Sequence, residues 1–161
     1  MIRHEYKHKG RFEFEAGGSI DGLKVVYHCS RKPWQDGDER KVIWICHALT
    51  ANSDAEDWWP ELVGPGRLFD TDKYFVVCAN MLGSAYGSSG PSTEDPLTGK
   101  PYYFDFPRIT VRDIVRANDL VRQHLGIEHI DFIDELEEVI KNPYVDGFIF
   151  GPNDLSASLG D

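Results

Sequence analysis

KVIWICHAL (residues 41–49) and YFVVCANML (residues 74–82) are the two runs of the sequence that decide the fold. Both are apolar and rich in β-branched side chains, and neither alternates apolar with polar residues. This pattern is typical of strands that are buried on both faces of a sheet. A short helix and a loop fit between the two runs, so the sequence predicts two parallel strands of an α/β sheet.

The chain before these runs favours a hairpin-like opening over residues 11–30. RFEFE (residues 11–15) alternates apolar and polar side chains, GGSIDG is a turn, and LKVVYHCS (residues 23–30) is a second strand. After the second buried run, residues 83–107 form a long loop of glycine, serine, proline and aromatic residues. A loop of this length inside a compact domain is usually functional.

The clearest helix is predicted over TVRDIVRANDLVRQHLG (residues 110–126). Thr110 is a candidate N-cap, and Asp113, three residues later, completes a variant of the capping box. Gly126 is a natural end. Five apolar residues are expected to share the buried face, namely Val111, Ile114, Val115, Val121 and Leu125. A strand at residues 127–133, a helix at 134–141 and a strand at 145–150 are expected to follow.

Composition excludes several classes of function. The 161 residues carry a net charge of -10, which argues against binding to nucleic acid or to an anionic membrane. No run approaches the roughly 18 apolar residues of a membrane helix. Three cysteines lie far apart in apolar runs, which is typical of buried, reduced thiols in a cytoplasmic protein (Cys29, Cys46 and Cys78).

Residues 12–130 resemble the homoserine O-acetyltransferases, which are α/β-hydrolase-fold enzymes. The motifs CHALTANSD, DWW, GRLFD, VVCAN, LGSAYGSSGP, TGKPY and DFPRITVRD occur in that family's order. The resemblance implies an acetyl transfer from acetyl-CoA to L-homoserine in methionine biosynthesis, with a small-molecule substrate and no bound cofactor. It also implies that residues 1–130 form the N-terminal portion of the fold, a partial, mostly parallel sheet. The backbone N–H of Leu49 would then belong to the oxyanion hole, and His47 would order the loop.

No catalytic residue is predicted in this chain. The family's nucleophile lies in a glycine-rich elbow after the strand that follows HLGIEHI, and its acid and histidine lie further downstream. The sequence contains no G-x-S-x-G, and the serines of LGSAYGSSGPS lack that spacing (Ser84, Ser88, Ser89 and Ser92). Without the triad we expect the chain to be inactive as it stands.

Residues 127–161 resemble a second family, the metal-dependent pyruvate-type aldolases related to citrate lyase subunits, through IEHID and VDGFIFGPNDLSASLG. This implies a strand–helix–strand–loop segment that binds Mg²⁺ or Mn²⁺ through Glu128 and Asp154, with Gly151 and Asn153 beside a substrate. The alternative is a solvated carboxylate at Glu128 and a helix N-cap at Asp154.

The overlap at IEHI indicates a chimera with its seam at residues 126–131, packed as one domain. Three hypotheses therefore stay open. The chain is a truncated acyltransferase, a non-catalytic chimeric α/β domain that dimerises through an exposed sheet edge, or a metal-binding remnant of an aldolase.

Overall fold

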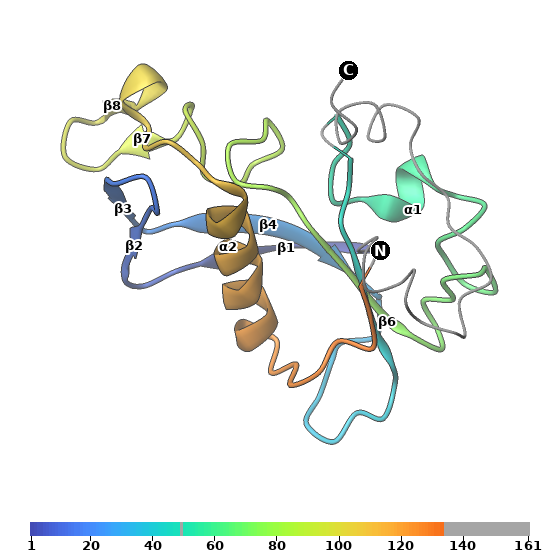
Figure 1. Ribbon diagram of the computed structural model, residues 1–161. Coiled ribbons are helices and arrows are strands. Elements are labelled where there is room, and N and C mark those ends of the chain that lie inside the picture. Colours follow the sequence, from blue (N-terminus) through green and yellow to red (C-terminus); the bar gives the residue numbers. More distant parts are fainter. Residues whose placement is uncertain (49, 134–161) are drawn as a thin grey trace, which may run out of the picture.

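A computed structural model describes residues 1–48 and 50–133, and for Phe132 and Ile133 only the backbone. Its centre is a five-stranded sheet in the order β1–β4–β6–β5–β9 (Figure 1). These strands are β1 Ile2–Lys7, β4 Lys24–Cys29, β5 Val42–Ile45, β6 Phe75–Ala79 and β9 Phe132–Ile133. The other elements are β2 Arg11–Glu13, β3 Ser19–Asp21, α1 Ala55–Trp58, β7 Glu94–Asp95, β8 Lys100–Pro101, the 3-10 helix η1 Tyr103–Asp105 and α2 Val111–His124.

The two buried runs pair as the sequence predicts. β5 and β6 are parallel neighbours, with Val42 opposite Phe75 and Ile45 opposite Cys78. β9 adds a parallel strand on the other side of β5. β4 is antiparallel to both β1 and β6, so it alone runs against the other strands of this sheet. The described residues therefore confirm an α/β fold, but the expected parallel arrangement holds only for β6, β5 and β9, since the pairings of β4 with β1 and β6 are antiparallel. The elements expected at 134–150 lie outside the described residues.

Both faces of the sheet are covered, which explains why its central strands lack alternation. Val42 and Trp44 face one apolar core together with Ala117 and Val121 of α2. Ile43 and Ile45 face a second core that includes Ala55 of α1. Figure 1 shows α2 crossing over β4. Helix α1 lies at the right of the picture, on the other side of β6 from α2. No helix in the part of the chain that the structure describes is long and apolar enough to cross a membrane.

The predicted opening hairpin is wrong in its pairing. β2 pairs with β3 in a ribbon of its own, and β4 pairs instead with β1, a strand that the sequence analysis missed. β1 is an edge strand with mostly exposed, charged side chains, so it carries no hydrophobic pattern. Two of the cysteines, Cys29 and Cys78, are buried as expected, but Cys46 is exposed.

Helix α2 begins with the predicted capping box. Thr110 Oγ1 accepts the amide of Asp113, and the Asp113 carboxylate accepts the amide of Thr110. Asp113 is fully buried, pairs with Arg116 and also accepts the amide of Glu15, which ties the helix to the chain after β2. The prediction of the buried apolar face is wrong in the first turns of the helix, because Val111 and Val115 are exposed.

We expect the change Asp113→Ala to lower the free energy of unfolding by about 2 kcal/mol, because it leaves the amides of Glu15 and Thr110 without an acceptor. Urea unfolding followed by circular dichroism measures the change. Asp119→Ala on the same helix is the control. Asp119 makes a partly exposed pair with Arg122, so its loss should cost less than about 1 kcal/mol. Equal losses in the two variants would contradict the expected role of Asp113.

Candidate functional site

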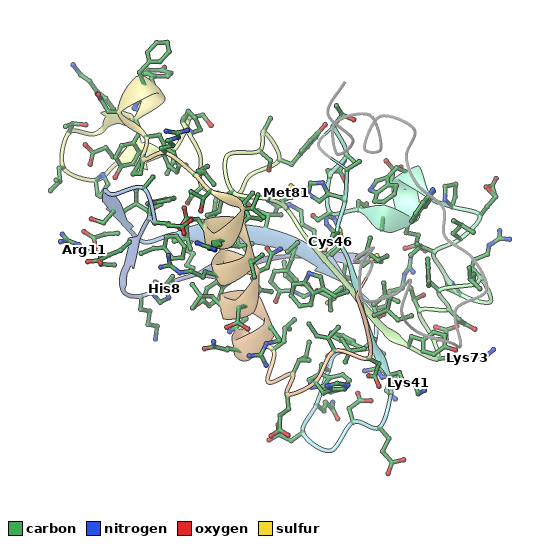
Figure 2. All side chains as sticks on the ribbon, in the orientation of Figure 1. His8, Arg11, Lys41, Cys46, Lys73 and Met81 are labelled. Atoms are coloured by element: carbon green, nitrogen blue, oxygen red, sulfur yellow. The ribbon has the colours of Figure 1, made fainter. Side chains whose placement is uncertain are left out.

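The site lies where the chain leaves β5 and β6. The connection after β5 passes to the face that carries α1, and the connection after β6 passes to the face that carries α2. Adjacent parallel strands whose connections separate in this way leave a crevice outside their carboxyl ends, where ligands of α/β proteins bind. Figure 2 shows Cys46 and Met81, which follow these strands, at one end of the sheet and Lys41 and Lys73, which precede them, at the other.

His47 holds the first of the two loops, residues 46–54, against the second, residues 80–90. Its Nε2 accepts the backbone N–H of Met81 at 3.3 Å, so this nitrogen carries no proton. Its Nδ1 therefore donates to the carbonyl oxygen of Ala48 at 2.8 Å. His47 is 3% exposed, and burial lowers its pKa. The ring is thus a neutral brace, which is the loop-ordering role expected from the sequence.

Asn80 is a second brace between the same two loops, and the sequence analysis missed it. The buried carboxamide accepts the amide of Ser53 through Oδ1 at 2.7 Å and donates to the carbonyl of Tyr86 through Nδ2 at 3.0 Å. The backbone N–H of Asn80 donates to the carbonyl of Val26 at 2.8 Å. This one residue therefore contacts the loop after β5, the loop after β6 and strand β4.

The motif LGSAYGSSG is a loop in which two of the three serines bind backbone amides. Ser88 and Ser89 are buried, and their hydroxyl oxygens accept the N–H groups of Val26 and Lys24. The loop folds back on itself, and a Cβ atom at Gly90 would lie 2.9 Å from the Cα of Gly83. The glycine is required by that close approach. As expected, these serines are not placed as nucleophiles.

A serine, a histidine and an aspartate do meet beside the site. His28 Nδ1 lies 2.7 Å from Ser53 Oγ, and His28 Nε2 lies 3.8 Å from Asp54 Oδ2. The three side chains line a cavity of about 250 Å³, together with Arg3, Val26, Asn52, Asp57, Asn80 and Tyr86. Ser53 is 0% exposed, and its hydroxyl is engaged by the His28 ring. The group therefore anchors the loop after β5 to β4.

The structure describes few of the residues that the resemblances single out. Leu49 lies outside the described residues, and so do Gly151, Asn153 and Asp154. Glu128 is described and is exposed on the approach to β9. Across residues 1–48 and 50–133, no group of three or more histidine, cysteine, aspartate or glutamate side chains gathers to hold a metal ion. The metal ligands Glu128 and Asp154 therefore stay predictions.

Curated relatives match most of this chain. It is 43% identical over 122 residues to a homoserine O-acetyltransferase of Nostoc punctiforme, covering 76% of this chain and 34% of that protein. It is 44% identical over 130 residues to that of Chlorobaculum parvum, covering 80% of this chain and 35% of that protein. The chain thus spans about a third of the length of these relatives. No protein-family model matches the chain.

Solved structures share the fold. Esterase E22 superposes with a TM-score of 0.72 at 28% identity, covering 82% of this chain and 39% of that one. The homoserine O-acetyltransferase from Bacillus anthracis gives a TM-score of 0.69 at 28% identity, with the same coverage of each chain. The structural neighbours are α/β-hydrolase esterases and acetyltransferases, and this chain shares their α/β fold. Over about three quarters of its length, the chain is homologous to the homoserine O-acetyltransferases.

The neutral histidines of the site predict a pH-dependent stability. Burial lowers the pKa of His28 and of His47 below the ordinary value of 6.5. The unfolded chain therefore takes up protons at these side chains before the folded protein does, as the pH falls below 6.5. We expect the free energy of unfolding to decrease from pH 7 toward pH 5, measured by urea unfolding at each pH.

His47→Gln should make this decrease smaller, because it removes one of the groups that resist protonation in the folded state. His129→Gln is the matched control, since His129 is exposed and makes neither of the contacts of His47. An unchanged pH dependence in His47→Gln would show that His47 is not held neutral by the fold.

Proposed function

We propose that this chain supplies the oxyanion side of a homoserine O-acetyltransferase-type site, in the lineage that transfers an acetyl group from acetyl-CoA to L-homoserine for methionine biosynthesis. The homology over three quarters of the chain supports the lineage. The single structural observation that carries the assignment is the braced loop after β5, held by His47 and Asn80 at the carboxyl edge of the sheet.

The chemistry of acyl transfer explains why a braced loop is useful. The tetrahedral intermediate places a negative charge on the former carbonyl oxygen, and a fixed backbone N–H stabilises that charge. By resemblance, the donor is the N–H of Leu49, which lies between Ala48 and Thr50. Both braces are neutral, so they add no negative charge that would oppose the developing oxyanion.

The 161 residues contain no G-x-S-x-G motif that could supply the nucleophile. β9 lies beside β5. In the related fold, the nucleophile is expected directly after the strand at this position. Here the residues that follow Ile133 are mostly acidic and include no glycine-flanked serine. We therefore propose that the 161 residues alone do not turn over acetyl-CoA and homoserine, since the acyl-serine route needs a nucleophile and a base.

The two other interpretations rest on sequence resemblance. The non-catalytic chimera and the aldolase-type metal site both depend on residues 127–161, most of which the structure does not describe. Phe132 and Ile133 follow the overlap at IEHI and extend the sheet in parallel beside β5. The exposed Glu128 has no cluster of metal-ligating side chains around it among the described residues.

An exchange of segments tests the proposed function. Residues 1–130 should replace the corresponding part of the Bacillus anthracis enzyme and leave acetyl transfer to homoserine measurable by release of free CoA. In that hybrid, Leu49→Pro removes the backbone N–H and should lower kcat by about 100-fold or more. Leu49→Ala keeps the N–H and serves as the control. Equal activity in the two variants would rule out Leu49 as the oxyanion donor.

A serine-reactive fluorophosphonate tests the chain by itself. We expect no covalent labelling of the 161-residue protein, because Ser53 is buried and Ser88 and Ser89 are held by backbone amides. The Bacillus anthracis enzyme, treated in parallel, controls for the reactivity of the probe. Stoichiometric labelling at one serine, located by mass spectrometry, would overturn the proposal that the chain lacks a nucleophile.

A further inference from the structure

Two consecutive residues at the end of β6 hold both ends of the loop that follows β5. The backbone N–H of Met81 binds the ring of His47, where the loop begins. The side chain of Asn80 binds the backbone N–H of Ser53, six residues further on. Between these two points the amide of Ala51 donates to the carbonyl of Ala48 at 2.9 Å, which closes a turn.

The orientation of the Asn80 carboxamide is fixed by its partners. Oδ1 faces a backbone N–H, that of Ser53, and Nδ2 faces a carbonyl oxygen, that of Tyr86. A flipped amide would set donor against donor and acceptor against acceptor. The side chain thus fixes the position of Ser53 relative to the loop after β6. An apolar residue of the same size would fill the space without doing so.

Ser53 is also held from its other side, which makes it a firm anchor for the end of the loop. Its hydroxyl lies 2.7 Å from Nδ1 of His28 on β4. Next to it, the amide of Asp54 donates to Oδ1 of Asn52 at 2.7 Å, and Nε1 of Trp58 donates to the carbonyl of Asn52 at 2.8 Å. The loop therefore enters α1 through a hydrogen-bonded segment, and Asn80 is the link from that segment to β6.

We propose that Asn80 is a positioning residue of the site: its carboxamide sets the backbone of the loop after β5 by holding the amide of Ser53. The proposal depends on the proposed function only for the role of the loop in acyl transfer. The clamp, meaning the hydrogen bonds by which Asn80 and Met81 hold the loop, is observed in this chain whatever its function. Asn80 acts through the loop and is not a catalytic residue. Neither resemblance of the sequence assigns it a role.

The test uses the full 161-residue chain and nuclear magnetic resonance relaxation of its backbone amides. Asn80→Leu matches the side chain in size but removes both polar groups. We expect the Ser53 amide to exchange with solvent about tenfold faster, as for one lost hydrogen bond. The order parameter of the Ala51 amide should fall from about 0.85, the value of rigid backbone, to below about 0.6.

Ser30→Ala is the matched control for a structural effect. Ser30 is buried, and its hydroxyl donates to the carbonyl of Tyr74 and accepts the amide of Val76, at the amino end of the sheet. It should lower the midpoint of urea unfolding but leave the Ala51 order parameter unchanged. A similar fall at Ala51 in Ser30→Ala, or no fall in Asn80→Leu, would overturn the proposal.

Asn80→Asp keeps the proposal testable if Asn80→Leu does not fold. It retains an oxygen acceptor for the Ser53 amide, but it sets a second acceptor against the Tyr86 carbonyl and buries a carboxyl group, so it should also lower the stability of the fold. We expect the Ala51 order parameter to stay near that of the parent chain, while the amides of residues 84–87 lose order. A loss of order at Ala51 in Asn80→Asp would count against the proposal. None of these readouts needs turnover, so an inactive segment-exchange hybrid would remove the proposed function and leave the clamp standing.

Discussion

The parallel pairing of β5 with β6 is the constraint on which the rest of the structure depends. Phe75, Val76, Val77 and Cys78 are all fully buried, so both faces of the pair must be covered. Parallel neighbours cannot be joined by a tight turn, and the chain must cross over a face between them. Because the two strands are parallel neighbours, the loops that leave β5 and β6 begin side by side at the carboxyl end of the sheet, and the two connections then pass to opposite faces.

The loops at that edge are held by uncharged groups. His47 and Asn80 are both nearly inaccessible to water, and each satisfies backbone groups that would be costly to bury without partners. A charged brace at the same depth would need its own counter-charge. Neutral braces let the loops approach closely without adding a charge to the crevice.

The sequence predicts the features that depend on local patterns. The apolar runs gave β5 and β6, and the spacing of Thr110 and Asp113 gave the start of α2. β1 was missed because an exposed edge strand is specified by its partner and not by hydrophobicity. His28, Ser53 and Asn80 were missed because each is a single polar residue whose importance arises only when segments 25 to 27 positions apart meet. The motifs shared with the related family indicate the loops near these residues, but they do not predict which atoms form hydrogen bonds.

The exposed thiol of Cys46 offers a position for chemical labelling beside the site. Burial raises the pKa of the Cys29 thiol to about 11 and raises that of Cys78 further, and the thiolate is the form that reacts with alkylating reagents. Cys46 is the exposed thiol of the three and directly precedes His47 at the end of β5. A maleimide dye would therefore attach at this one position, where its fluorescence would report on whatever approaches the carboxyl edge of the sheet.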